Sequence, residues 1–289
     1  MKIIRLNDND IQNFSQYEIH KSIKNQEANL YIYKKDYLLK LFKSTDNNIL
    51  DNKMYILNKL FYIRNYIDIK EIVWPNDLVK IGDVSRGFTM DFIKNNTNIS
   101  LIFNSNKIPS STKLYYLKLI GKILEKIEND KELNKIGFHL SDIHEGNFIL
   151  DNINNVVRAI DIDSSSVLGS NASKSKFLFK NDKLWDFKSK YPLDDNNYHI
   201  PNKNTTIISF VYMLLNLITG YYTPDLSIHD FVLTLNILST VGVNKELLDS
   251  IFNIYSKNDN YFDYDLVSSI KPKMIEDYKE LRLKIWQAK

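Results

Sequence analysis

Three side chains that carry oxygen atoms lie in one short stretch, residues 139–166, where their types and spacing suit a metal ion. Asp142 is followed by Asn147 five residues later, and Asp161 comes fourteen residues after that. Two short apolar runs lie between Asn147 and Asp161, separated by the turn residues 151–155, and this pattern predicts a β-hairpin. Because a hairpin brings its two ends together, the oxygen atoms would meet at one edge, which suits Mg²⁺ and a phosphate chain.

The composition is that of an ordinary globular protein. The 289 residues are 44% hydrophobic and 25% charged, which permits a substantial core in one domain or in two lobes. The net charge of +3 is small, so charge alone predicts neither a nucleic-acid nor a membrane partner. The absence of cysteine excludes disulfides and thiol nucleophiles, and it fits a cytoplasmic location. The N-terminal residues lack an apolar signal core, and the longest apolar run, residues 207–218, is too short for a membrane span and predicts a buried helix.

Residues 1–93 are predicted to be mostly β-sheet with one helix. Aromatic and β-branched residues alternate with polar ones between residues 17 and 43, which predicts a meander of three antiparallel strands. Apolar residues at helical spacing predict a helix over residues 46–63. Two further strands are expected near residues 78–81 and 87–93.

Residues 94–289 are predicted to be mostly helical, apart from the hairpin and an irregular polar segment at residues 164–200. A first helix is expected to start at Pro109-Ser110-Ser111, with a serine as its N-cap. The polar residues 94–98 are the expected hinge between the two parts. Further helices are expected over residues 206–220, 227–240, 244–256 and 273–287.

The residues around Asp142 also resemble a known motif. Residues 142–147 read D-I-H-E-G-N, which resembles the D-[LI]-H-x-G-N loop of small-molecule phosphotransferases such as the aminoglycoside and choline kinases. They also resemble the H-R-D-x₄-N loop of protein kinases. Residues 159–164, A-I-D-I-D-S, stand where protein kinases have D-F-G, and bacterial kinase-like proteins have D-x-D-S at this point.

Three further matches follow the order of the same family. Leu38-Leu39-Lys40 resembles the V-A-I-K strand, residues 90–93 resemble the M-E-Y-V hinge that borders adenine, and residues 209–220 resemble the buried helix of the kinases. Together the matches span most of residues 17–220. The resemblance implies an α+β, bilobal protein kinase-like fold. Its smaller lobe, an antiparallel sheet with one helix, would comprise residues 1–93, and its larger, mainly helical lobe residues 94–289, the two forming one domain.

The resemblance implies ATP and Mg²⁺ as cofactors and gives each matched residue a role. Asp142 would orient an acceptor hydroxyl and take its proton, since phosphoryl transfer needs positioning and charge neutralisation more than covalent catalysis. Lys40 would reach the phosphates as a point charge. The other assignments are Asn147 and Asp161 as Mg²⁺ ligands, His144 as a contact of the γ-phosphate, Met90 at the back of the adenine pocket, and the backbone of Asp91 and Ile93 as the hydrogen-bond partners of adenine.

The sequence also departs from the family. The turn at residues 24–26 has no glycine, and a glycine-rich loop is what lets backbone N–H groups approach phosphates closely, so we expect a looser or side-chain-mediated lid. No glutamate occurs between residues 28 and 70, so the usual acidic partner of Lys40 is missing from the first helix. Matching Ile56-Leu57 to the first helix of the family would place Lys53 there, and Asp51 is an alternative of shorter reach. Other departures are Leu140 in place of the H-R-D histidine, no A-P-E motif after Asp161, and Thr206 in place of an acidic anchor.

Three classes of function therefore remain open. The first is an ATP-dependent phosphotransferase that acts on Ser or Thr of a protein, or on a small-molecule hydroxyl. The second is a pseudokinase that binds nucleotide as a regulatory or scaffolding module, and the third is a nucleotidyl transferase. Retention of Lys40, Asp142, Asn147 and Asp161 favours the first. The sequence specifies neither the acceptor nor the oligomeric state, and the lysines of residues 174–190 fit an acidic acceptor as well as a solvated loop.

A zinc-dependent hydrolase is a further alternative. His139, Asp142, His144 and Glu145 are possible zinc ligands. A tight zinc site would need a second cluster of ligands, however, and the other three histidines are scattered along the chain.

Overall fold

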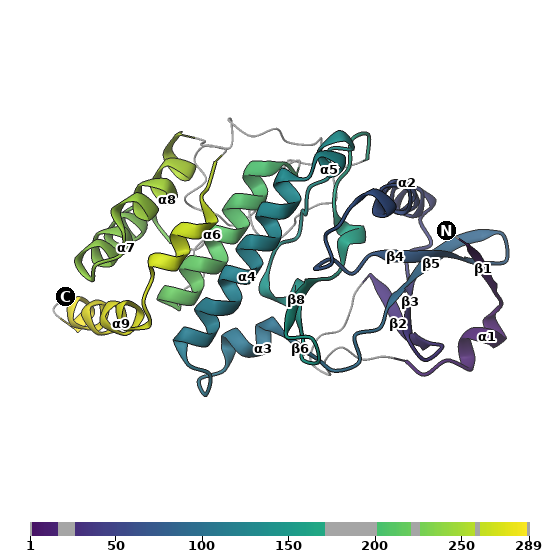
Figure 1. Cartoon of the computed structure of the whole chain (residues 1–289), viewed down its shortest axis with the longest axis horizontal. Coiled ribbons are helices and arrows are strands. Elements are labelled where there is room, and N and C mark those ends of the chain that lie inside the picture. Colours follow the sequence, from purple (N-terminus) through teal and green to yellow (C-terminus); the bar gives the residue numbers. More distant parts are fainter. Residues whose placement is uncertain (1, 17–26, 171–200, 221–225, 258–260, 288–289) are drawn as a thin grey trace.

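The computed structural model describes residues 2–16, 27–170, 201–220, 226–257 and 261–287, and these form a mixed structure of helices and strands. A five-stranded sheet lies at one end of the molecule, a three-stranded sheet lies near the middle, and a group of helices lies at the other end (Figure 1). The strands and helices are, in chain order, β1 (Ile3–Leu6), α1 (Asp8–Gln12), β2 (Ala28–Tyr33), β3 (Tyr37–Phe42), α2 (Asn47–Ile63), β4 (Pro75–Ile81), β5 (Val84–Asp91), β6 (Asn96–Asn98), α3 (Ile99–Asn104), α4 (Ser110–Asn129), α5 (Lys131–Lys135), β7 (Phe148–Asp151), β8 (Val156–Ala159), α6 (Lys203–Thr219), α7 (Ile228–Thr240), α8 (Lys245–Lys257) and α9 (Pro272–Gln287).

The five-stranded sheet has the order β1-β4-β5-β3-β2, and only the β1–β4 pair is parallel. The second and third strands of the predicted meander are confirmed as β2 and β3, whereas the first, over residues 17–23, lies outside the described residues. The two later strands are confirmed as β4 and β5, each of which begins three residues earlier than expected. Strand β1 was not predicted, because the strand it pairs with is distant in the sequence: Ile3 pairs with Leu78.

Lys40 lies on β3, in the interior of this sheet, and its side chain is 3% exposed. Because side chains alternate along a strand, Lys40 shares a face with Phe42. Helix α2 covers this face through an apolar cluster made of Ala28, Phe42, Leu50, Leu57, Phe61, Leu78 and Phe88. A buried ammonium group needs compensating charge, so Lys40 must meet an acid inside the protein.

Gly87 lets β5 approach β3 closely. A Cβ atom at this position would lie 1.9 Å from the backbone oxygen of Lys40, far inside van der Waals contact. A side chain at position 87 would therefore displace the strand that carries Lys40.

Helix α2 confirms the helix predicted over residues 46–63. Asp46 is its N-cap, and the Asp46 carboxylate accepts a hydrogen bond of 2.9 Å from the backbone nitrogen of Asn48. The face of α2 that turns inward is apolar except for Lys53, which is 9% exposed. The helix thus delivers a second ammonium group to the protein interior.

One local prediction was wrong, and one strand was not predicted. Helix α4 begins at Ser110 and its N-cap is Pro109 rather than a serine, because the Pro109 carbonyl already accepts hydrogen bonds from the backbone of Thr112 and Lys113 at 3.0 and 3.2 Å. The predicted hinge at residues 94–98 contains strand β6, which pairs with β7. Its Asn-Thr-Asn sequence has no apolar alternation that would have indicated a strand.

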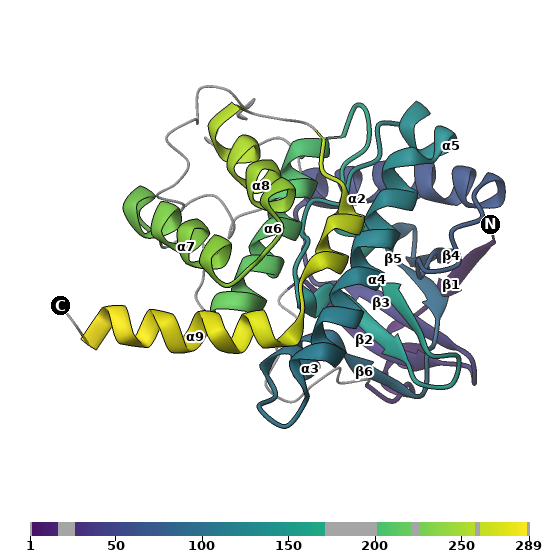
Figure 2. The ribbon, with the colours of Figure 1, turned by 60° about the vertical axis from the view of Figure 1, so that its left-hand side comes forward.

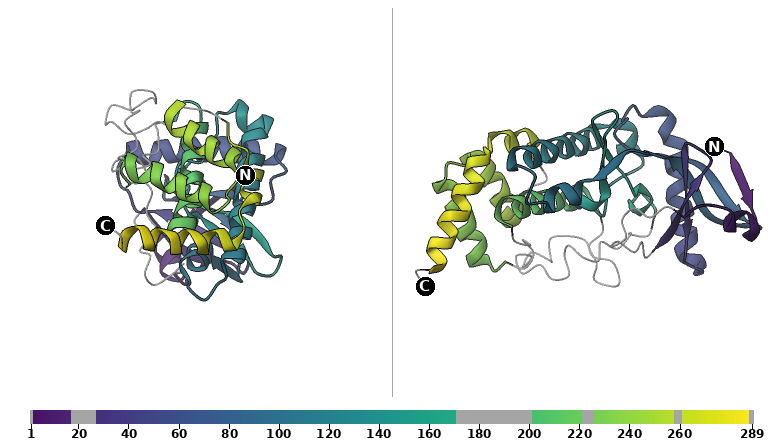
Figure 3. Two further views of the ribbon diagram at one scale, coloured as in Figure 1. Left: turned by 90° about the vertical axis from the view of Figure 1, so that its left-hand side faces the viewer. Right: turned by 90° about the horizontal axis from the view of Figure 1, so that it is seen from below.

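Helix α6 confirms the predicted buried helix and is surrounded by other elements. It packs against α4, α8 and α9 (Figure 2). The helices predicted over residues 227–240, 244–256 and 273–287 are confirmed as α7, α8 and α9. Seen from below, α9 and the five-stranded sheet lie at opposite ends of the molecule (Figure 3). None of the helices in the described part of the chain is both long and apolar enough to cross a membrane.

Candidate functional site

Strands β7 and β8 form the predicted hairpin and pair along their full length. The Asp151 carboxylate stabilises the turn by accepting hydrogen bonds from two backbone nitrogens of the turn, both at 3.1 Å. At the open end, the backbone nitrogen of Ile160 donates to the backbone oxygen of Asn147 at 2.9 Å. The pairing therefore holds Asn147 beside the segment that continues into Asp161.

Asp142 is held by Asn147 and His144. The Asn147 amide nitrogen donates to the backbone oxygen of Asp142 at 2.8 Å and approaches the Asp142 carboxylate at 3.4 Å. His144 Nε2 lies 3.6 Å from the same carboxylate. Burial alone would raise the pKa of Asp142, but the contacts with His144 and Asn147 outweigh it and hold the pKa below its usual range. Asp142 is therefore a carboxylate at neutral pH and can accept a hydrogen bond from a hydroxyl group.

Asp161 has a strained backbone and binds Lys40. Its φ angle is +63°, an uncommon value for a residue other than glycine. Strained residues of this kind persist where surrounding contacts hold them, and they concentrate at functional sites. The Lys40 ammonium donates a hydrogen bond to the Asp161 carboxylate, so two residues 121 positions apart in the sequence meet. The sheet and the hairpin thus join at this ion pair.

Asp163 is the acidic partner that the sequence analysis did not identify. Its Oδ1 lies 2.6 Å from Lys40 Nζ, and its Oδ2 lies 3.3 Å from Lys53 Nζ. Burial would raise the pKa of Asp163, but the two lysines outweigh it and hold the pKa well below its usual range. Burial likewise favours a lower pKa for Lys40, but Asp161 and Asp163 raise it. Asp51 is exposed on α2, so it is wrong as the alternative partner.

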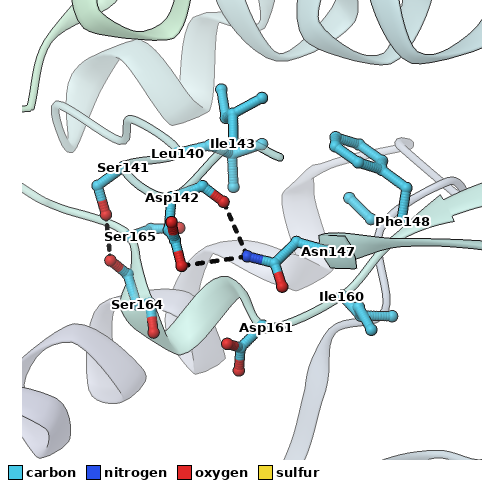
Figure 4. Close-up of a pocket in the computed structure, with 11 residues that line it drawn as sticks. Leu140, Ser141, Asp142, Ile143, Asn147, Phe148, Ile160, Asp161, Ser164 and Ser165 are labelled. Atoms are coloured by element: carbon cyan, nitrogen blue, oxygen red, sulfur yellow. Dashed lines mark hydrogen bonds between the residues drawn. The ribbon is translucent and has the colours of Figure 1, made fainter. Parts of the chain in front are cut away.

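The oxygen-bearing side chains of the site line one pocket, which includes Asp142, Asn147, Asp161 and Ser164 (Figure 4). Because the Asn147 amide nitrogen is directed at Asp142, the amide oxygen is left as the possible metal ligand. The Asp161 carboxylate and the Asn147 amide oxygen fit Mg²⁺, which takes one or two carboxylates and leaves its other positions to water and phosphate oxygens. Among the described residues, no group of three or more His, Cys, Asp or Glu side chains could hold a metal ion, so phosphate oxygens would have to complete the coordination.

The residues predicted to bind adenine lie at the end of β5, next to the strand that carries Lys40. Met90 packs against the apolar cluster beneath α2. The Asp91 side chain accepts a hydrogen bond from Asn76 at 2.7 Å, and the Ile93 backbone oxygen accepts one from the Asn96 side chain at 2.5 Å. These three residues are not among those that line the pocket with Asp142.

His139 lies in a second pocket, which Glu128 and Lys203 also line. Burial lowers the pKa of His139. Lys203 Nζ lies 3.6 Å from the Glu128 carboxylate. The side chain of His139 therefore does not join Asp142 and His144, as the zinc alternative required.

Comparison with protein-family models and with curated proteins found no relative of this chain. No protein-family model matches the chain, and no curated protein matches it in sequence. Any assignment of function must therefore rest on the motif and on the geometry of the site.

Proposed function

We propose that this chain is an ATP-dependent phosphotransferase with a protein kinase-like, bilobal fold. It would transfer the γ-phosphate of ATP to a hydroxyl group, and we favour Ser or Thr of a protein over a small-molecule hydroxyl as the acceptor. The observation that carries the proposal is the meeting of Lys40 with Asp161 beside Asp142 and Asn147. A sheet covered by α2 at one end and a group of helices at the other supports the two-lobed arrangement. The cysteine-free sequence fits a cytoplasmic location.

The proposed chemistry gives each residue one task. Mg²⁺, held by Asn147 and Asp161, would neutralise charge on the phosphates. Lys40 would bind phosphate oxygens, and Asp142 would orient the acceptor hydroxyl through a hydrogen bond. The hydroxyl oxygen then forms a bond to the γ-phosphorus while the bond from that phosphorus to the bridging oxygen of ADP breaks. ADP leaves with the electron pair, and the proton of the hydroxyl passes to the Asp142 carboxylate.

A nucleotide-binding pseudokinase is the second candidate. The glycine-free turn at residues 24–26 and the missing glutamate of the first helix favour it, and transfer would require Asp161 to exchange Lys40 for Mg²⁺. Thermal melting with ATP, with and without Mg²⁺, measures binding separately from chemistry. Stabilisation by Mg²⁺-ATP without transfer of label would support the pseudokinase. Transfer of label from the α-phosphate would instead support a nucleotidyl transferase.

The experiment that tests the proposal uses purified protein, Mg²⁺ and γ-labelled ATP. Transfer of label is measured to the protein itself, to a mixture of Ser- and Thr-containing proteins, and to water. We expect Asp142→Ala and Asp161→Ala to lose transfer by about a hundredfold or more. Asp51→Ala, an exposed carboxylate on α2, is the matched control and should transfer label like the parent. If both site variants keep the parental rate, the catalytic assignment is wrong.

A further inference from the structure

Lys40 and Lys53 both contact the buried carboxylate of Asp163. The two oxygens of Asp163 contact different ammonium groups, Oδ1 that of Lys40 and Oδ2 that of Lys53, and the Asp163 side chain is 0% exposed. Lys53 Nζ also lies 3.2 Å from the Asp163 backbone oxygen, 3.2 Å from Ser164 Oγ and 3.3 Å from the Glu27 carboxylate. Lys53 is therefore directed at the segment that follows Asp161, and it contacts Ser164, which lines the pocket.

The contacts of Lys53 are looser than those of Lys40. Its two contacts with carboxylates, those of Glu27 and Asp163, both lie at 3.3 Å, longer than the 2.7–2.9 Å that is usual between an ammonium and a carboxylate. The Glu27 side chain is 66% exposed, and an exposed ion pair contributes little stability. The Glu27 contact is therefore the one that an incoming anion can replace at the smallest cost.

The charge balance of the cluster leaves room for such an anion. If Asp161 turns to a metal ion and Glu27 moves into solvent, Lys40 and Lys53 keep only Asp163 between them. Two cations and one anion then remain in a largely buried place. A surplus charge of this kind is stable only with a further negative group. Ser164, which Lys53 contacts, lines the same pocket as Asp142 and Asp161, so the negative group would be a ligand of this pocket.

We propose that Lys53 is a second phosphate-binding lysine, which exchanges Glu27 for a phosphate oxygen of the bound nucleotide and keeps its contact with Asp163. This inference rests on the proposed function and names a residue for it. A side-chain cation on α2 then does what backbone N–H groups do in a glycine-rich loop. By the resemblance to protein kinases, Lys53 would take the place of their acid, while Asp163 supplies the acidic partner of Lys40.

The test is the affinity of ATP, ADP and adenosine, measured calorimetrically with Mg²⁺ for the full chain. We expect Lys53→Met to weaken ATP and ADP by about tenfold to a hundredfold, the range for a hydrogen bond to a charged group, and to change adenosine less than about twofold. Glu27→Gln removes the competing carboxylate and should tighten ATP about threefold, which is about 0.7 kcal/mol. Lys59→Met is the matched control, because Lys59 lies on the same helix over the Tyr55 ring, and ATP affinity should not change.

The possible failures are distinguishable. If the parent binds neither ATP nor adenosine, the proposed function fails and this inference fails with it. If the parent binds ATP while Lys53→Met leaves ATP affinity unchanged, or weakens adenosine as much as ATP, Lys53 does not bind phosphate. Circular dichroism shows whether Lys53→Met folds. If it does not fold, an unchanged ATP affinity in Glu27→Gln overturns the proposal.

Discussion

The buried carboxylate of Asp163 gives the sharpest prediction about how the site is held together. Asp163→Asn keeps the shape of the side chain but removes its charge. One amide atom can still accept a hydrogen bond from one lysine, whereas the amide nitrogen would face the other. Removing one partner of a buried ion pair costs about 3–5 kcal/mol, because the remaining charge stays buried without compensation. We therefore expect the free energy of unfolding to fall by this amount, with a melting temperature roughly 10 °C lower.

Urea unfolding followed by circular dichroism measures the loss. The pKa of Asp163 is lowered in the folded protein, so its stabilising contribution is present above the unfolded pKa of about 3.8 and is lost as the pH falls through the lower folded value. The difference between parent and variant should therefore be constant from pH 5 to pH 8. Asp51→Asn, exposed on α2, should change stability by less than about 0.5 kcal/mol. An Asp163→Asn protein as stable as the parent would refute the buried bridge between Lys40 and Lys53.

Two further predictions concern the strand that carries Lys40 and the partner of Asp142. Gly87→Ala places a Cβ atom 1.9 Å from the Lys40 oxygen and should destabilise the protein by more than about 2 kcal/mol in urea unfolding. The Cβ atom of Gly82→Ala would have no atom within 4 Å, so this variant should lose only the roughly 1 kcal/mol that a left-handed backbone costs a residue with a side chain. Equal losses of stability in the two variants would contradict the close packing at Gly87. The pKa of His144 is raised, against the effect of burial, by its contact with Asp142. NMR titration should show that the pKa of His144 falls in Asp142→Asn. The stability that the pair contributes should be complete below pH 6.5 and lost as the pH rises through the raised pKa of His144. An unchanged His144 titration would show that the contact is absent in solution.

The features that follow from local sequence were predictable. The hairpin of β7 and β8 could be predicted because its turn and its two apolar runs lie within fifteen residues, and α2 could be predicted from apolar residues at helical spacing. Strand β1 could not, since its partner β4 is more than seventy residues away. β6 was missed because its three polar residues carry no periodic signal.

Within the site, too, contacts between residues close in the sequence were predictable and contacts between distant residues were not. The motif places Asp142 and Asn147 close together, and their contact follows from a separation of five residues. The two acidic partners of Lys40 lie 121 and 123 residues away, and tertiary packing, including that of α2 against residues 162–164, brings them to the lysine. The sequence contained one signal for Asp163, the D-x-D pattern at residues 161–163. That pattern does not indicate that both acids contact Lys40, or that Asp163 also contacts Lys53.

The central claim is that Asp142 and its neighbours transfer the γ-phosphate of ATP. The most direct measurement is the initial rate of Mg²⁺-dependent transfer of γ-label by the parent, Asp142→Asn and Asp51→Asn at equal concentrations of folded protein. Our account predicts measurable transfer by the parent and by Asp51→Asn, and a loss of about a hundredfold or more in Asp142→Asn. Equal rates for Asp142→Asn and the parent, or no transfer by the parent to any acceptor or to water, would contradict it.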